Sequence, residues 1–193
     1  MILRTNSQLA VRWYFLRGLA VLSFLAFLSL DGQILGLVGQ EGILPIAPAI
    51  EGAGVESAWD GFFGQPALVW FFNSDLALRA MTLGGIILSV LLFLDVFPKL
   101  LLLLLWFDYL SLTVAGRLFL SYQWDMLLLE TLFVSIFFAP GNIVPGGERQ
   151  EPTNLSVFLL RVVFFKLMFL GGVAKLLSGE RNLVGTHGPA VSF

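Results

Sequence analysis

The sequence contains no cysteine and a single histidine, His187. Without cysteine the chain forms no disulfide, no thiolate metal site and no cysteine nucleophile. One histidine does not build a histidine-based metal cluster, and its place in the polar tail excludes a Ser-His-Asp triad inside this chain. No nucleotide, haem or metal motif stands out among the other residues. We therefore expect neither a metal nor a cofactor.

Charge is also scarce. Only 12% of the 193 residues are charged while 58% are hydrophobic, and the mean hydropathy is +0.89. Soluble domains carry about 25% charged and about 45–50% apolar residues. The net charge of −2 leaves no basic face for nucleic acid. The composition predicts an integral membrane protein with lipids as partners.

Apolar segments long enough to cross a bilayer recur along the chain. A spanning helix needs about 20 mostly apolar residues. Turn residues separate the segments, so we predict an all-α membrane protein, a bundle of about five transmembrane helices at 13–30, 77–94, 100–120, 124–139 and 155–177. In the second of these, Gly85 and Ser89 lie four residues apart, which lets a neighbouring helix approach that face closely.

Positive charge is absent from the long connection at 31–75, whereas Arg4, Arg12 and Arg17 crowd the N-terminal end. Cytoplasmic loops carry the excess of lysine and arginine, so we predict a cytoplasmic N-terminus and an extracytoplasmic 31–75. Its many apolar side chains predict an ordered loop. The run at 67–72 is too short to span, and we expect it to lie in the membrane interface or to pack beneath the loop.

The last three predicted spans contain seven charged residues. A charge at the centre of a membrane helix costs about 2.5–3.5 kcal/mol on insertion scales, so such residues usually face one another. We therefore take them as a candidate intramembrane charged network, made of Asp108, Arg117, Asp125, Glu130, Arg161, Lys166 and Lys175.

Depth predicts which of these charges meet. Glu130 precedes Pro140 by ten residues, roughly 15 Å of helix, and Lys166 lies at a similar depth, roughly 16 Å from the same face. The two charges are opposite and matched in depth, so we predict that they pair.

The other charges sort by depth as well. Asp125 is level with Arg117 and Lys175 at the outer ends of their helices, and Asp108 and Arg161 both fall in the inner half. One interpretation is that such pairs only set helix register and orientation. The other is a polar pocket that handles a lipid, a quinone or a peptide. The sequence favours the first.

Three blocks of the sequence, in order, carry a resemblance. They are Arg-Trp-Tyr-Phe-Leu-Arg-Gly-Leu at 12–19, the block at 119–140, and Phe-Lys-Leu-Met-Phe-Leu-Gly-Gly-Val-Ala-Lys within 161–179. Together they resemble the lipase maturation factor family. The central block is its most recognisable one and contains the motif residues Gln123, Trp124, Asp125 and Glu130.

The resemblance implies a five-span membrane domain that assists the folding or dimer assembly of secreted lipases. It implies the endoplasmic reticulum membrane for a eukaryotic-like member and the inner or plasma membrane for a bacterial one. The membrane region is also distantly similar to that of vitamin K-dependent carboxylases, but no catalytic histidine aligns. We therefore expect a non-catalytic assembly factor, with a secreted lipase as its candidate client. The alternative is a lipid- or quinone-handling enzyme or carrier, and the sequence does not determine the oligomeric state.

The resemblance also bears on domain organisation. It covers the chain to about residue 180, which we expect to be one transmembrane domain, 1–180. Family members continue from this point into a large aromatic-rich domain outside the membrane. Here an atypical tail at 181–193 follows instead, so we expect that soluble domain to be absent, in a truncated product or a short member.

Overall fold

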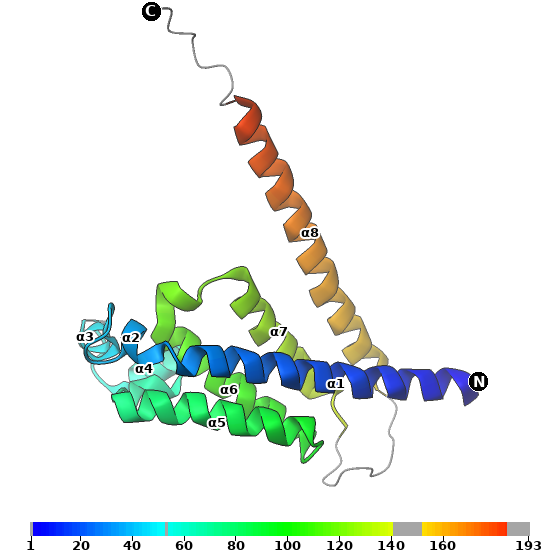
Figure 1. Cartoon of the computed structure of the whole chain (residues 1–193), viewed down its shortest axis with the longest axis horizontal. Coiled ribbons are helices and arrows are strands. Elements are labelled where there is room, and N and C mark those ends of the chain that lie inside the picture. Colours follow the sequence, from blue (N-terminus) through cyan, green and yellow to red (C-terminus); the bar gives the residue numbers. More distant parts are fainter. Residues whose placement is uncertain (1, 53, 141–151, 185–193) are drawn as a thin grey trace, which may run out of the picture.

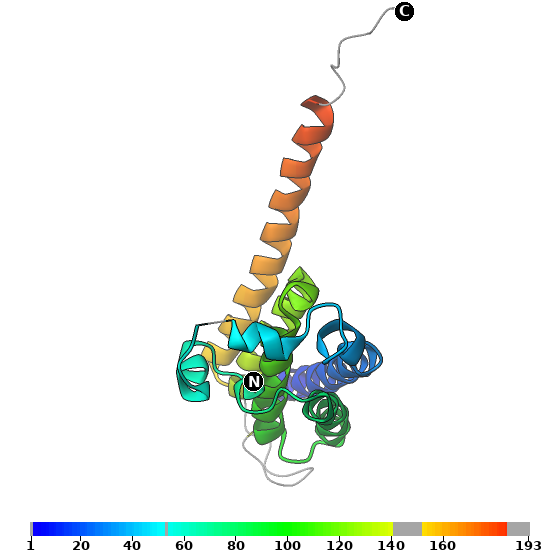
Figure 2. The ribbon, with the colours of Figure 1, turned by 90° about the vertical axis from the view of Figure 1, so that its left-hand side faces the viewer.

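The computed structural model describes residues 2–52, 54–140 and 152–184, and within these ranges the regular structure is helical. Helix α1 (Ile2–Asp31) and helix α5 (Asp75–Phe93) lie side by side (Figures 1 and 2). Ser74 begins α5 as its N-cap, because its side chain accepts a hydrogen bond from the Ala77 N–H at 3.3 Å.

The face of α5 that carries small residues is where α1 packs. Gly85 lies against Phe27 of α1, and a Cβ atom at position 85 would overlap the phenyl ring. Ser89, one turn further on, is also buried. The close helix approach predicted from the spacing of Gly85 and Ser89 is therefore confirmed.

Helix α6 (Pro98–Gly116) lies at the centre of the bundle, in contact with α5 on one side and α7 (Gln123–Phe138) on the other. Proline at the start of α6 costs no hydrogen bond, since the first N–H groups of a helix have no partner inside it. Leu101, Leu102 and Leu105 of the leucine run are buried in the core, and Tyr109 packs edge-on against Phe27 with ring centroids 5.4 Å apart. A short 3₁₀ turn, η2 (Arg117–Leu120), follows α6.

Residues 31–75 fold into a helical cap over one end of the bundle, which we call the cap. It contains four short helices: α2 (Ile34–Val38), α3 (Ile46–Glu51), α4 (Ala58–Gly64) and η1 (Leu68–Trp70). The prediction of an ordered loop is confirmed for the described part of this segment.

Backbone-to-side-chain hydrogen bonds hold the cap on the bundle. The Leu68 N–H donates to Ser111 Oγ of α6 at 2.9 Å, and the Gln40 N–H donates to Asp75 Oδ1 of α5 at 2.8 Å. Ala67 and Val69 are fully buried. The run at 67–72 therefore packs beneath the loop, which was one of the two predicted arrangements.

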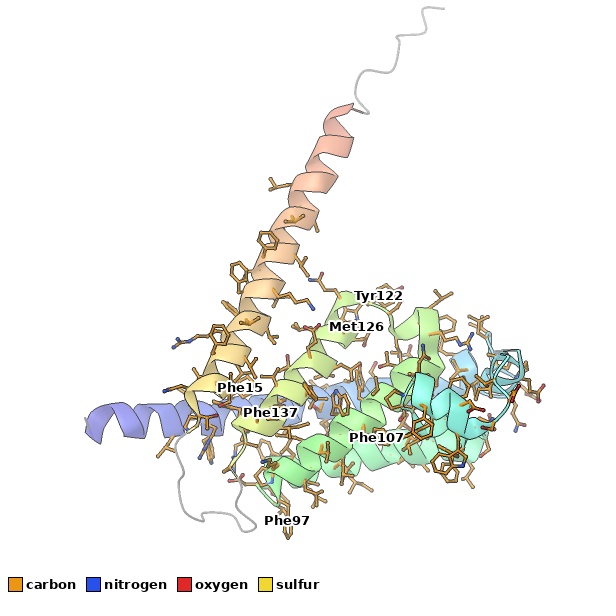
Figure 3. The ribbon with its side chains drawn as sticks, turned by 180° about the vertical axis from the view of Figure 1, so that it is seen from behind. Phe15, Phe97, Phe107, Tyr122, Met126 and Phe137 are labelled. Carbon is orange, nitrogen blue, oxygen red and sulfur yellow. The ribbon has the colours of Figure 1, made fainter. Side chains whose placement is uncertain are left out.

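Helix α8 (Asn154–Val184) packs on α7 and extends away from the rest of the bundle (Figure 1). Apolar side chains project from it along much of its length (Figure 3), and most of its described side chains are exposed. The helix continues through position 180, where we expected the domain to end. Residues 185–193, including His187, lie outside the described part of the chain.

Four described helical segments are long and apolar enough to cross a membrane: Leu9–Asp31, Asp75–Phe93, Pro98–Leu120 and Asn154–Leu176. The chain is therefore an all-α integral membrane protein. The remaining predicted span corresponds to α7, whose 16 residues extend about 24 Å. That is shorter than the hydrocarbon core of about 30 Å, so a fifth complete crossing stays a prediction.

Candidate functional site

The predicted charge pair joins α7 to α8. The ammonium group of Lys166 donates a hydrogen bond to Glu130 Oε1, and the two side chains form an ion pair. Their contact confirms the pairing that their matched depths predict.

A cavity of about 110 Å³ lies beside the pair, between α7 and α8. Met126 and Leu127 line it from α7, and Val163 and Leu167 line it from α8. Pockets for small molecules usually have about 300–1,000 Å³. The space next to Glu130 and Lys166 is therefore too small for a quinone or a lipid, and the geometry favours a link between helices.

The link matters more in lipid than it would in water. Lipid tails are as apolar as the side chains of α8, so burying those side chains against α7 brings little hydrophobic gain. Helix association there depends on packing and on interhelical hydrogen bonds. The bond between Lys166 and Glu130 is therefore well placed to hold α8 on the bundle.

Asp125 lies five residues before Glu130 on α7 but faces α6 instead. Its side chain is buried, and Tyr109 donates a hydrogen bond to Asp125 Oδ1 at 2.7 Å. The second oxygen, Oδ2, is buried without a hydrogen-bond partner among the described residues. Tyr109 is thus a polar contact that joins α6 and α7 in the interior.

Arg117 does not pair with Asp125, contrary to the prediction from depth. Helix α6 ends at Gly116, and Arg117 adopts φ 44° and ψ −111°, so its side chain leaves the helical direction. Its guanidinium donates to the Ala49 carbonyl of the cap at 3.3 Å. Depth along an ideal helix fails here because the backbone turns at this residue.

The inner pair predicted from depth does not form either. Asp108 is buried on α6, whereas Arg161 is exposed on α8, which packs against α7. No ion pair joins these two side chains in the described structure. Lys175 is exposed further along α8. Of the seven predicted charges, Glu130 and Lys166 meet, whereas the pairs of Asp125 with Arg117 and of Asp108 with Arg161 do not form among the described residues.

The remaining motif residues lie at the start of α7. Gln123 lines the small cavity between α7 and α8. Trp124 is exposed and stacks on Tyr122, with ring centroids 4.9 Å apart. Such half-exposed aromatic pairs are typical of the membrane interface.

Several polar contacts were not predicted from the sequence, and two of them join neighbouring parts of the bundle. One is Tyr109, whose hydroxyl inside a leucine-rich helix was itself a signal, because a buried tyrosine usually finds a partner. The other is Arg17, which lies 3.9 Å from Asp95 and 3.9 Å above the ring of Trp13. This contact ties α1 to the turn between α5 and α6. Among the described residues, no cluster of three metal-ligating side chains occurs.

Comparison with known proteins places this arrangement in a family. The sequence model described as the lipase maturation factor transmembrane domain matches residues 10–184. Lipase maturation factor 2 of Xenopus tropicalis is 37% identical over 182 residues, covering 90% of this chain and 26% of that protein. Its human counterpart is 36% identical over 185 residues, covering 86% of this chain and 26% of that protein.

Lipase maturation factor 1 of Bos taurus is 31% identical over 188 residues, covering 93% of this chain and 33% of that protein. The chain thus spans about a quarter to a third of the length of these curated relatives. No solved structure matches. The match to the family model covers the helical bundle, the cap and the paired helices α7 and α8, and the chain belongs to the lipase maturation factor family.

Proposed function

We propose that this chain acts as the membrane-embedded part of a maturation factor that assists the folding or assembly of secreted lipases, without catalysing a reaction itself. The observation that carries the proposal is the match of residues 10–184 to the family's transmembrane domain. The relatives are named as maturation factors, and a lipase client follows from those names.

The geometry of the paired charges supports a non-catalytic role. Glu130 and Lys166 satisfy each other directly, and the space beside them is about 110 Å³. A membrane enzyme acting on a lipid or a quinone at this pair would need a larger cavity. We assign the pair to holding α8 against α7.

The orientation that we propose places the N-terminus in the cytoplasm and the cap outside it. Arg17 in the first spanning segment and Lys99 in the first turn of α6 lie at the same end of the bundle, and the cap has neither lysine nor arginine. The cap then faces the compartment in which secreted lipases fold. In a eukaryotic cell this is the lumen of the endoplasmic reticulum, and in a bacterium it is the outer side of the inner membrane.

Co-expression with a secreted lipase tests the function. We expect the chain to co-purify with the lipase and to raise the fraction of lipase that is active, measured as activity per amount of lipase protein. Glu130→Gln should lower the amount of folded membrane protein, while the molecules that remain folded keep their effect.

The enzyme hypothesis gives a different result in the same experiment. A well-folded Glu130→Gln variant would then lose a product detectable by mass spectrometry of the lipid extract. Loss of such a product, or an unchanged fraction of active lipase when the wild-type chain is present, would contradict the proposed role.

A further inference from the structure

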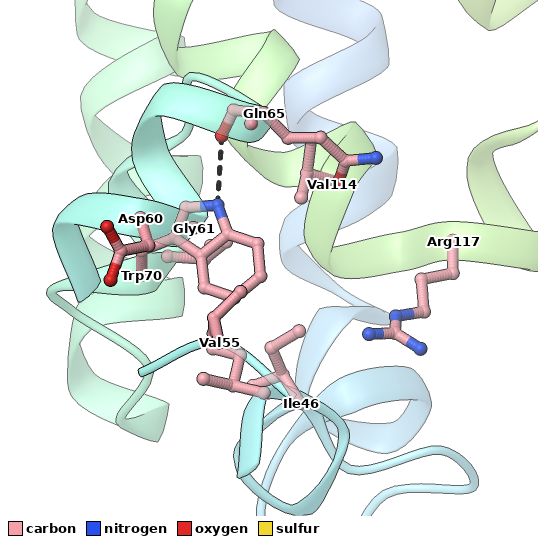
Figure 4. A pocket seen from close by; sticks show the side chains of 11 residues that line it. Ile46, Val55, Asp60, Gly61, Gln65, Trp70, Val114 and Arg117 are labelled. Atoms are coloured by element: carbon pink, nitrogen blue, oxygen red, sulfur yellow. Dashed lines mark hydrogen bonds between the residues drawn. The ribbon is translucent and has the colours of Figure 1, made fainter. Parts of the chain in front are cut away.

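A second and larger cavity lies between the cap and the outer end of α6 (Figure 4). Its volume is about 590 Å³, which falls within the range of about 300–1,000 Å³ for small-molecule pockets. It is separate from Glu130 and Lys166, which do not line it. Neither the resemblance to the family nor the proposed lipase role requires it.

One wall of this cavity is apolar and rigidly held. The indole N–H of Trp70 donates to the Gln65 carbonyl at 2.9 Å, and the ring lies directly on Gly61, where an added Cβ atom would overlap it. Val114 of α6 and Ile46 of the cap continue the apolar lining. A hydrogen bond and a close contact within the cap therefore hold the Trp70 ring in place.

The opposite side presents a cation. Arg117 lines the cavity, and its guanidinium extends toward it from the end of α6 (Figure 4). It contacts the Ala49 carbonyl and forms no ion pair with a described residue. Its positive φ of 44° is strained for a residue with a side chain, and strained positions of this kind concentrate at functional sites.

The other charged residue of the lining, Asp60, does not neutralise this cation. Its carboxylate accepts a hydrogen bond from Ser57 Oγ at 2.7 Å and points away from Arg117 (Figure 4). The charge directed into the cavity is therefore positive. An anion near Arg117 would add an ion pair, with stronger hydrogen bonds, to the one bond that the guanidinium donates to the Ala49 carbonyl.

The cavity also lies at the depth where amphiphiles are found. Arg117 follows the end of α6, within the last turn of a candidate membrane span. Helix α4, which lines the cavity with Gly61, exposes Trp59 and Phe63 on its surface, and Trp59 packs on Phe71 with ring centroids 4.9 Å apart. Clusters of exposed aromatic rings mark the membrane–water interface.

We propose that this cavity binds a single-chain amphiphile with an anionic head, a carboxylate or a phosphate. The head lies at Arg117, and the acyl chain lies along Trp70 and Val114. The positive charge, the apolar wall and the interfacial position each correspond to one part of such a molecule. The inference does not depend on the proposed lipase role, because it rests on the cavity alone.

Photolabelling of the full chain in nonionic detergent micelles tests the proposal. A fatty acid that carries a diazirine on its chain is the probe, and mass spectrometry locates the label. We expect saturable labelling of the peptides that contain Trp70 and Val114, with labelling of the exposed α8 surface rising linearly as an internal reference. Unlabelled oleate and lysophosphatidate should both compete, whereas monoacylglycerol and inorganic phosphate should not. Competition by only one of the two anionic lipids identifies the head group.

Two variants remove the site in different ways. Arg117→Gln should weaken competition by oleate about tenfold or more, because a hydrogen bond to a charged group is lost, and Arg117→Lys should keep part of it. Val114→Phe should weaken saturable labelling by narrowing the cavity beside Trp70 while Arg117 stays. The matched control is Arg79→Gln, which removes an exposed cation near the outer end of α5 that does not line the cavity.

The following results would contradict the proposal. If saturable labelling is absent from the Trp70 and Val114 peptides, or if monoacylglycerol competes as well as oleate, no anion site is present. Should Arg117→Gln not fold, Val114→Phe decides, and unchanged saturable labelling in that variant overturns the proposal. If Arg79→Gln weakens competition by oleate as much as Arg117→Gln does, the effect comes from surface charge and the proposal is wrong.

Discussion

Two carboxylates of α7, the half-exposed Glu130 and the buried Asp125, each contact one partner side chain. Glu130 has Lys166, and Asp125 has Tyr109, each from a neighbouring helix. A carboxylate surrounded by apolar helices is costly when it stands alone, so removal of the partner exposes that cost. The packing of α7 against α8 therefore depends on the contact of Glu130 with Lys166. The packing of α6 against α7 depends on the contact of Tyr109 with Asp125.

Glu130→Gln should destabilise the protein by about 1.5–3 kcal/mol, because Lys166 loses a charge-assisted hydrogen bond. For a domain of this size, each kcal/mol lowers Tm by about 2–4 °C. Thermal unfolding in detergent measures the change. The charge exchange Glu130→Lys with Lys166→Glu should restore part of the loss, and no restoration would leave the pair without energetic support. Glu56→Gln, at an exposed position of the cap, serves as the control and should stay within about 0.5 kcal/mol.

Tyr109→Phe should also destabilise the protein, by about 1–3 kcal/mol, since Asp125 Oδ1 then loses its hydrogen bond and Oδ2 already lacks one. The same unfolding experiment measures the loss. Tyr14→Phe removes a hydroxyl from an exposed tyrosine and should change stability by less than about 0.5 kcal/mol. In a double-mutant cycle with Asp125→Asn the two changes should not add, and strict additivity would refute the coupling.

At the scale of elements, the bundle depends on how closely α1 approaches α5. The phenyl ring of Phe27 occupies the space that a side chain at position 85 would need. The backbone of Gly85 is helical, so any residue could adopt its conformation. Glycine is required there because Phe27 of the neighbouring helix leaves no space for a side chain. A Cβ atom at the adjacent Gly84 would meet nothing within 4 Å, so the same helix contains its own control.

Gly85→Ala should therefore destabilise the protein by about 1–3 kcal/mol through overpacking against Phe27. Gly84→Ala should be neutral or stabilising by up to about 1 kcal/mol, since alanine favours a helix over glycine. Unfolding of both variants in the same detergent gives the comparison. Equal effects of the two substitutions would mean that the contact between Gly85 and Phe27 is not tight in the membrane.

In the described structure, helix α8 makes its main helix contact with α7. Its apolar side chains are as well solvated by lipid as by protein, so apolar area alone does not determine where it lies. The hydrogen bond from Lys166 is a polar contact on the face of α8 that is turned to α7. The family motif at the start of α7 lies at the same contact, through Gln123.

At the scale of the whole molecule, orientation in the membrane decides which compartment the cap faces. The absence of cysteine makes this directly testable, because a single introduced cysteine is the only thiol. Glu56→Cys in the cap should react with a membrane-impermeant maleimide added from outside the cytoplasm. Lys99→Cys, at the opposite turn, should react only after the membrane is permeabilised. Labelling of both from the same side would contradict the proposed orientation.

Much of the fold could be predicted from composition and spacing. Apolar runs of about 20 residues indicate spanning helices because the bilayer leaves the backbone few alternatives. The small-residue spacing of Gly85 and Ser89 predicts a close helix contact, and the matched depths of Glu130 and Lys166 predict their pairing. These predictions rest on positions along regular helices, where depth and face follow from residue number.

The predictions failed where the chain departs from a regular helix and where the packing places two helices apart. Arg117 was assigned to Asp125 by depth, but α6 ends at Gly116 and the backbone turns the guanidinium toward the cap. Asp108 and Arg161 were matched in depth but lie on helices that are not neighbours in the described packing. Depth gives the position of a residue along the membrane normal only. Pairing also depends on the direction of the side chain and on which helix is adjacent.

By itself the sequence determined that this protein is an all-α membrane protein of the lipase maturation factor family, because hydropathy and motif order are linear properties of the chain. The tertiary structure alone decided that Tyr109 is the partner of Asp125, that Arg117 turns toward Ala49 of the cap, and that a cavity with Arg117 in its lining lies between the cap and α6. Each of these depends on residues distant in sequence, which only the packing of helices and cap brings together.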